Sequence, residues 1–383
     1  MERILVLSVS SRGTSIMNIE GKKTFAILMV IAGCLISNSS LKLAAASINI
    51  DDLPERASFS AATSAISDGL VSLTVTTNSL ITNALSNRMT NVKGCLADPF
   101  VYAVYGHNQS NVAAECGYKG NTHGGLVLGV DHVWTFADKR YFRLGAAMGY
   151  VLEGTTFFGT LSGTFSGVAY THSFSKKSDI NVYALRLFGA YESFNDKCLK
   201  TNIGVMLGYN HGKDQFISSE SMSNDVLLGV EFTKNLYAYI GYQLGLWLQT
   251  NYGFILQTIV HNGSPQDISF DTKFIHDFLA TVVGLNIEKE IFVHADRKLT
   301  LSLKAGWECR VIQRSIVTLD ATLGADELYG IFRLKHPCKN AALLSFKASQ
   351  KLNDHWSLAG SYTGRFNGDL ATHNLAGGVE YSF

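Results

Sequence analysis

Apolar and polar residues alternate without a break along residues 299–311, LTLSLKAGWECRV. Leu299, Leu301, Leu303, Ala305, Trp307, Cys309 and Val311 occupy every second position. The positions between them, from Thr300 to Arg310, carry polar, charged or glycine residues. A period of two is that of a β-strand whose two faces meet different surroundings. The segment therefore predicts a strand with one apolar and one charged face, as in a barrel wall between lipid and a polar lumen.

The same alternation recurs from about residue 98 to the end of the chain, and it predicts an all-β fold. Twelve strands are expected, near 99–107, 124–136, 140–154, 180–194, 200–212, 225–234, 236–250, 277–291, 298–311, 341–352, 355–366 and 373–383. An even number is typical of bacterial single-chain membrane barrels. Most of these segments have about 9 to 15 residues, which is enough for a tilted strand to cross the apolar band.

The predicted connections alternate between long and short. Long ones are expected at 155–179, 251–276 and 312–340, and short ones at Lys234-Asn235 and Asn353-Asp354. Outer-membrane barrels have short periplasmic turns and long outer loops, so the alternation predicts a twelve-stranded antiparallel transmembrane β-barrel. Aromatic residues near strand ends are expected in the interfacial girdles; they are Trp134, Phe136, Tyr141, Phe292 and Trp356.

Composition agrees with this fold and excludes others. Apolar residues make up 46% of the chain and charged residues only 16%. The part after the leader has no apolar run long enough for a transmembrane helix. Only 4 prolines accompany 35 glycines, which suits many closely packed strands. The net charge of +1, without a basic patch, gives no reason to expect nucleic acid as a partner.

The first 46 residues have the pattern of an export signal with an N-terminal extension. Lys22 and Lys23 precede an apolar run at 25–36, and an alanine triplet ends at Ala46. This pattern predicts a secretory signal peptide cleaved between Ala46 and Ser47. The alternative is lipidation of Cys34, because the residues before it resemble a bacterial lipobox. Both interpretations predict an exported chain.

Residues 47–97 differ from the rest of the chain. A helix is expected over 70–94, because Leu80, Ala84 and Met89 lie near one face, with Arg88 beside them. The residues before it are small and polar and could not bury much of a core on their own. The predicted domains are thus 1–46 for the signal, 47–97 for a short N-terminal segment with its helix, and 98–383 for the barrel.

Two motifs and the tail of the chain resemble a known family. Gly124, Gly125, Leu126, Leu128, Gly129 and Asp131 form the first motif, and Gly145, Ala146, Met148, Gly149 and Tyr150 form the second. Together with the last two predicted strands, they resemble the autotransporter β-domain, the translocator of type V secretion. The resemblance implies an N-terminal helix in the pore and a passenger carried to the cell surface. The stretch before the helix is short for such a passenger.

The last predicted strand ends with an aromatic residue. Leu375, Gly377, Val379, Tyr381 and Phe383 share one face. This strand is expected to close the barrel against the first, since an open strand edge is not tolerated in lipid. Val379, Tyr381 and Phe383 also resemble the C-terminal signal that the barrel-assembly machinery receives.

Charged residues on the polar face of the strands are expected to line the pore lumen. They are Arg186, Glu231, Lys304, Glu308, Arg310, Lys347 and Arg365. Their mixed signs fit a hydrated pore or a lumen that holds the helix, with Arg88 paired to Glu231 or Glu308. The alternative is that each is a solvated lumen residue with no selective role.

Cysteines and catalytic motifs complete the sequence evidence. Cys95, Cys116, Cys198, Cys309 and Cys338 form an odd set. This cysteine content resembles that of the polymorphic membrane proteins in the disulfide-linked envelope of chlamydiae. The alternative is that the cysteines are not linked to other proteins. The sequence has no catalytic, nucleotide-binding or metal-binding motif, so no enzyme, cofactor or metal is expected. The predicted function is anchoring or translocating the N-terminal segment in outer-membrane lipid. The alternatives are a structural or adhesive surface protein with a host ligand and a small-solute pore.

Overall fold

A computed structural model describes residues 77–86, 88, 89, 98–110, 116–136, 140–165, 168–196, 199–214, 219–239, 241–261, 269–294, 297–323, 326–333, 340–368 and 370–382. All of these lie in one compact unit, residues 48–383. Cys34, Ala46, Ser47 and Phe383 fall outside the described residues, as do Cys95, Cys198 and Cys338.

The described chain is one helix followed by thirteen strands. The strands are β1 (Asp98–Ser110), β2 (Cys116–Phe136), β3 (Arg140–Phe165), β4 (Val168–Asp196), β5 (Leu199–Asp214), β6 (Ser219–Tyr239), β7 (Tyr242–His261), β8 (Ser269–His294), β9 (Arg297–Leu323), β10 (Asp326–Arg333), β11 (Asn340–Lys351), β12 (Trp356–Phe366) and β13 (Leu370–Tyr381). The helix covers 77–86, with 88 and 89 also helical. We call it the plug helix.

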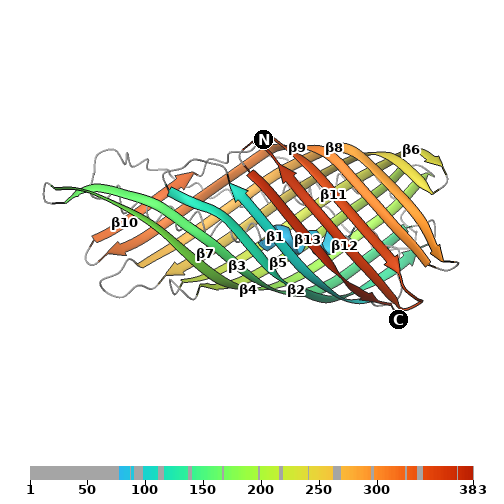
Figure 1. The fold of residues 1–383 in the computed structure, drawn as a ribbon, viewed down its shortest axis with the longest axis horizontal. Helices are drawn as coiled ribbons and strands as arrows, with labels where there is room; N and C mark the ends of the chain where they lie inside the picture. The colour runs from blue at the N-terminus through green and yellow to red at the C-terminus, as the bar shows by residue number, and fades with distance from the viewer. Residues whose placement is uncertain are drawn as a thin grey trace, which may run out of the picture. The chain divides into compact units, whose positions relative to one another are not determined.

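Twelve of the strands form a closed antiparallel barrel. Neighbours in sequence pair from β1 to β9, β9 then pairs with β11, and the circle continues through β12 to β13. The last strand pairs with the first, with Val101 opposite Val379 and Phe100 opposite Glu380. Figure 1 shows the tilted strands wrapping around the short helix. The predicted fold, a twelve-stranded antiparallel barrel with an N-terminal helix inside, is confirmed.

The alternation of side chains is also found in the barrel wall. On β7, Leu244, Leu246 and Leu248 are exposed on the outer face, while Trp247 between them is 2% exposed and faces the interior. On β9, Trp307 and Val311 are exposed, whereas Lys304 and Glu308 are buried. A wall that is apolar outside and polar inside reverses the usual arrangement of a water-soluble protein. None of the described helices is both long enough and apolar enough to span a membrane.

The strands are longer at one end of the barrel than the sequence predicted. The connection expected at 155–179 is a hairpin, in which β3 and β4 stay paired up to Phe165 and Val168. Most of the expected loops at 251–276 and 312–340 are also strand, and the latter contains β10, which pairs only with β9 among the described strands. The hairpin of β3 and β4 reaches far beyond its neighbours (Figure 1). The polar, glycine-containing sequence of these segments resembles loop sequence, because strands outside an apolar band do not need alternating apolar residues.

One predicted turn is in the wrong place. Lys234 and Asn235 do not form a turn, since they pair with Leu246 and Gly245 within the ladder of β6 and β7. The chain reverses six residues later, between Tyr239 and Tyr242, where Gly241 has a φ of 76°. Glycine adopts this left-handed conformation without the penalty of a side chain. The turn predicted at Asn353-Asp354 is found there, and the Asn353 side-chain oxygen accepts hydrogen bonds from two backbone amides.

Candidate functional site

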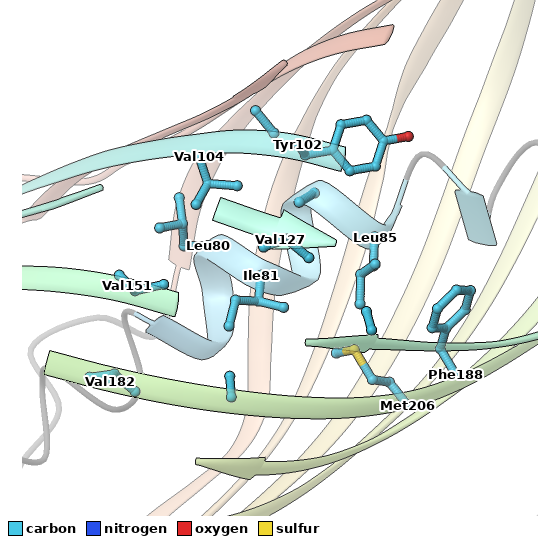
Figure 2. Packing of buried hydrophobic residues seen from close by; sticks show 14 of the residues in the cluster. Leu80, Ile81, Leu85, Tyr102, Val104, Val127, Val151, Val182, Phe188 and Met206 are labelled. Carbon is cyan, nitrogen blue, oxygen red and sulfur yellow. The ribbon is translucent and has the colours of Figure 1, made fainter. Parts of the chain in front are cut away.

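The plug helix packs its apolar side against the inner wall of β1 to β5. Leu80, Ile81 and Leu85 have no exposed surface. They belong to one cluster with inward residues of the wall, namely Val104, Val127, Val151, Val182, Phe188 and Met206. We call these six residues the plug-facing wall. In Figure 2 the side chains of Ile81 and Leu85 point toward it. Burial of this kind stabilises by about 1.5–3 kcal/mol for each large apolar side chain.

Two glycines let the helix approach the wall closely. A Cβ placed on Gly149 would lie 3.1 Å from the Ile81 side chain. A Cβ on Gly204 would lie 2.7 Å from the end of Met89. Any larger residue at either position must therefore displace a side chain of the helix. Gly149 belongs to the second sequence motif, so part of that motif is explained by helix packing.

Arg88 ties the C-terminal end of the helix to the strands that close the barrel. Its guanidinium donates to both oxygens of the Asp131 carboxylate on β2, with Nη2 2.8 Å from Oδ1. Nη1 lies 3.2 Å from the Glu380 carboxylate on β13, and Nη2 lies 3.5 Å from that of Asp98 on β1. The guanidinium also lies 4.5 Å from the centre of the Phe100 ring. One buried arginine thus contacts three neighbouring strands. Its contact with Asp131 is bidentate, the geometry that makes arginine–carboxylate pairs strong.

The surroundings of Arg88 are themselves connected. Arg143 on β3 donates to the same Asp131 carboxylate at 3.0 Å, and the Tyr102 hydroxyl donates to Glu380. Two arginines and three carboxylates therefore share one interior cluster at the seam between β13 and β1. Charges buried in this way are retained only when paired and hydrogen-bonded.

A second arginine holds the other end of the helix, and here it belongs to the wall. Arg186 on β4 has no exposed surface. Its Nη2 donates to the side chains of Asn78 on the helix at 2.6 Å and Asn210 on β5 at 2.7 Å. Asp225 on β6 lies 3.5 Å away and supplies the opposite charge. The two ends of the helix are thus fixed by two separate polar clusters.

Polar side chains of the wall contact the helix at further points along its length. Thr363 on β12 donates to Asn83 at 2.6 Å, and Asn374 on β13 donates to Ser79 at 3.1 Å. Asn202 on β5 donates to the backbone oxygen of Met89 at 2.7 Å, which satisfies a carbonyl at the helix terminus. Each of these wall residues follows the inward side of the strand alternation.

The opposite wall carries charges that pair with one another. Lys304 on β9 donates to Glu231 on β6 at 2.6 Å and lies 5.0 Å from the centre of the Trp247 ring. Glu308 lies between two cations, Arg310 at 2.9 Å and Arg365 at 2.8 Å. We call Glu231, Lys304, Glu308, Arg310 and Arg365 the charged wall. Within the described residues, no group of three or more His, Cys, Asp or Glu side chains is placed to hold a metal ion.

The structure places the predicted site residues in three settings. Arg186, Glu231, Lys304 and Glu308 are buried in the interior, while Arg310, Lys347 and Arg365 are partly exposed. Val379 is exposed on the outer face of β13, with Tyr381 partly exposed at the end of the strand. Cys309 is a free cysteine on the outer face of β9.

Two predictions are wrong, one about the partner of Arg88 and one about the position of Tyr141. Arg88 does not pair with Glu231 or Glu308, because those carboxylates pair with cations of their own wall and Arg88 faces the opposite side. Tyr141 does not lie in an outer girdle; it points inward and packs edge-on against Phe194. The other predicted girdle residues, Trp134, Phe136, Phe292 and Trp356, are exposed.

Known structures share this fold. The translocator domain of the autotransporter NalP from Neisseria meningitidis matches with a TM-score of 0.54 and 12% identity, covering 84% of this chain and 99% of that one. The chain has the fold of an autotransporter translocator domain. The transport unit of the autotransporter AIDA-I from Escherichia coli matches with a TM-score of 0.50 and 12% identity, covering 81% of this chain and 97% of that one. No family model matches the sequence, and no curated protein matches it.

Sequence reasoning missed most of the residues that hold the helix. The sequence places Asp131 in a motif but does not indicate its partner. It gives no separate indication for Asp98, Asn78, Asn202 or Asn374. The sequence does contain a signal for the wall residues. Polar side chains at inward positions of a predicted strand, close to glycines, indicate a place where another element packs against the wall.

Proposed function

We propose that the protein is an outer-membrane β-barrel of the autotransporter type, which anchors or translocates its short N-terminal segment at the cell surface without catalysing a reaction. The observation that carries this proposal is a helix fixed at both ends inside a closed barrel whose outer face is apolar. Such a barrel satisfies its backbone internally and tolerates lipid on all sides.

The outer face supports the membrane assignment. Leucines at successive outward positions of neighbouring strands are exposed, as are the aromatic residues Trp134, Phe136, Phe292 and Trp356 near the short turns. Apolar surface of this extent is not found on ordinary soluble monomers. Aromatic girdles at the ends of an apolar band are typical of outer-membrane barrels, in which short turns face the periplasm.

The direction of the helix supports display at the outer side. Arg88, near its C-terminal end, contacts Asp98 at the start of β1, which lies at the short-turn end of the barrel. Asn78, near its N-terminal end, contacts Arg186 about halfway along the membrane part of β4. The N-terminal end of the plug helix is therefore directed toward the side of the long hairpins, which is the outer side of such barrels.

Accessibility of a tag on intact cells tests this proposal. An epitope inserted at residues 50–55 should be labelled from outside, whereas the same epitope inserted between Asn353 and Asp354 should be protected until the outer membrane is broken. Correct assembly of both variants is checked by the heat-dependent mobility of the folded barrel in gels. Labelling of the turn with protection of the N-terminal tag would reverse the topology and refute display of the segment.

A second candidate function is favoured by the hairpin of β3 and β4. It stays paired as far as Phe165 and Val168, beyond the reach of β2, whose pairing with β3 ends at Cys116 and Gly159. A ribbon that projects this far suits a structural or adhesive protein that presents its outer loops to a host ligand. Shortening the hairpin by removing residues 160–173 should abolish adhesion in that case and leave display of the N-terminal tag intact.

Two partners follow from the proposal. The barrel-assembly machinery is expected to receive the C-terminal strand through Val379, Tyr381 and Phe383. The cysteines outside the membrane band are candidates for disulfide links to other envelope proteins, since thiols oxidise in that compartment.

A further inference from the structure

A histidine and a glutamate lie opposite each other on the inner face of the barrel wall. His123 on β2 pairs with Glu153 on β3 in the antiparallel register. Each is 1% exposed, whereas Leu152 beside Glu153 is 52% exposed on the outer face, so Glu153 faces the interior. Residues directly opposite on neighbouring strands have Cβ atoms about 4.5–5.5 Å apart. The imidazole and the carboxylate can therefore contact one small ion between them.

The acceptor atoms of this pair have no donor in the part of the chain that the structure describes. Nothing there donates a hydrogen bond to either oxygen of Glu153 or to Nδ1 of His123. The inward neighbours of Glu153 are apolar, since Val151 lies two residues before it on β3 and Ile180 is opposite it on β4. A buried carboxylate without a donor or an opposite charge is costly, and buried charges are normally paired or bound to a metal ion. A bound cation would remove this cost.

Asn374 on β13 fixes the orientation of the imidazole. A Cβ placed on Gly106 of β1 would overlap Nε2 of His123 and would lie 2.8 Å from Oδ1 of Asn374, so these two atoms lie close together over Gly106. The amide nitrogen of Asn374 donates to Ser79 on the plug helix at 3.1 Å, which leaves its oxygen for the ring. Nε2 is thus the protonated nitrogen, and Nδ1 remains as an acceptor. Histidines that bind metal ions usually donate their other ring proton to an oxygen of this kind.

We propose that His123 and Glu153 bind a divalent transition-metal ion of the zinc class, through Nδ1 of His123 and the carboxylate of Glu153. An imidazole with a carboxylate suits Zn²⁺, whereas Mg²⁺ and Ca²⁺ prefer oxygen ligands alone. Two side chains are fewer than the three usual in protein zinc sites, so water completes the coordination and the affinity is moderate. The site lies beside Val151 of the plug-facing wall, and it does not depend on what the barrel displays.

Zinc binding by the refolded full-length barrel tests the proposal. The protein is treated with a chelator and dialysed against graded concentrations of free Zn²⁺, and its bound zinc is measured by elemental analysis. His123→Ala and Glu153→Gln should each weaken binding at least about tenfold, since even residues that only support a ligand contribute about 10–100-fold to metal affinity.

His276→Asn is the matched control for adventitious binding to histidine. His276 is also a buried inward histidine, at 2% exposure, but its Nδ1 is already hydrogen-bonded to Ser315 at 2.6 Å. This substitution should leave zinc binding unchanged. An equal loss of zinc in His276→Asn and His123→Ala would show that the bound metal is not specific to the proposed pair.

Asn374 is a positioning residue in this site, and it is tested by a pair of variants. Asn374→Ala should weaken zinc binding about tenfold, because the imidazole loses the acceptor that orients it. Asn374→Asp should restore most of the affinity, because it keeps an oxygen for the Nε2 proton. Equal weakening in both variants would overturn the role given to Asn374.

Unfolding in urea separates a metal ligand from a carboxylate with a structural partner. In chelator, Glu153→Gln should not destabilise the barrel, because it removes a buried charge that has no partner. In Zn²⁺, the midpoint should rise for the wild type and stay constant for Glu153→Gln, because only the wild-type folded state gains a bound ion.

The remaining outcomes decide against the site or its metal. Absence of zinc binding by the wild type, or equal binding by wild type, His123→Ala and Glu153→Gln, overturns the site. Destabilisation by Glu153→Gln in chelator also overturns it, because the carboxylate would then have a partner within the protein. Equal binding of Ca²⁺, with the same dependence on both residues, overturns the zinc class. Folding is scored separately by heat-dependent gel mobility, so if one variant fails to fold, the other decides.

Discussion

The two halves of the lumen wall use their interior residues in different ways. The plug-facing wall offers apolar side chains and glycines, and its charged neighbours Asp131 and Arg186 are directed at the helix. The charged wall pairs its own members across strands, as Lys304 does with Glu231 and Glu308 with two arginines. Buried polar groups beside the plug-facing wall have partners on the helix, whereas those of the charged wall have partners within that wall.

This difference indicates what the helix contributes. Buried polar groups that lose their partner are costly, whereas a self-paired network keeps its partners when a distant element leaves. Loss of the helix should therefore be felt in β1 to β5 and at the β13–β1 seam, and hardly at all in β7 to β9. The barrel itself is held by its complete ladder of backbone hydrogen bonds.

Deleting residues 47–94 should produce the largest effect. Removal of the plug helix leaves a closed barrel with a polar, water-accessible interior, so a channel that is closed or nearly closed should conduct ions steadily. The deletion spares all of β1, which begins at Asp98. Single-channel recording of refolded full-length and deleted proteins in planar bilayers measures the change. Identical conductance in both would place the helix outside the conducting path.

Arg88→Ala should cause the largest loss of stability among single substitutions. It leaves Asp131, Asp98 and Glu380 without their shared cation on the helix, although Arg143 still contacts Asp131. Breaking a buried ion pair by removing one partner typically costs about 3–5 kcal/mol. Urea unfolding of the refolded barrel, followed by tryptophan fluorescence, measures it.

The same experiment has a built-in control for the seam. Asp131→Asn with Arg88→Met removes both charges of the strongest contact, and it should destabilise the barrel by less than the sum of the two single variants, because each single variant leaves the other charge without this partner. If the double variant is as unstable as the sum of the two single variants, the Arg88–Asp131 contact is not the interaction that holds the helix.

Leu248→Arg should be the next most harmful change, because it tests the outer face near the middle of β7. Leu248 is 41% exposed on the apolar side, and an arginine at mid-depth on the lipid face costs about 2–4 kcal/mol. The neighbouring Gln249 faces the interior, where it donates to Asn251 at 3.1 Å. Gln249→Arg should therefore be mild. Equal effects at 248 and 249, measured by unfolding in lipid vesicles, would contradict a lipid-facing outer wall.

The comparison of the two walls also explains what the sequence could predict. The period of two depends on local contrast between lipid and lumen, so the strands and the inward charges could be placed from the sequence. The partner of Arg88 could not, because Asp98, Asp131 and Glu380 meet only after β13 closes on β1, across nearly the whole length of the chain. Hairpins beyond the membrane were missed for the opposite reason, since both of their faces are free to be polar.

Arg365→Ala should have the smallest effect and is the most direct test of self-sufficiency in the charged wall. Arg365 is one of two cations at Glu308, and Arg310 remains 2.9 Å from that carboxylate after the substitution. Because Glu308 keeps a charged partner, the loss should be about that of one ordinary hydrogen bond, roughly 0.5–1.5 kcal/mol. The substitution should also leave the helix in place, since Thr363, on the same strand, still donates to Asn83. Unfolding in urea gives the free energy, and bilayer recording of the same sample shows whether the pore stays closed. A loss as large as that of Arg88→Ala, or an open channel, would show that the charged wall depends on the helix side after all.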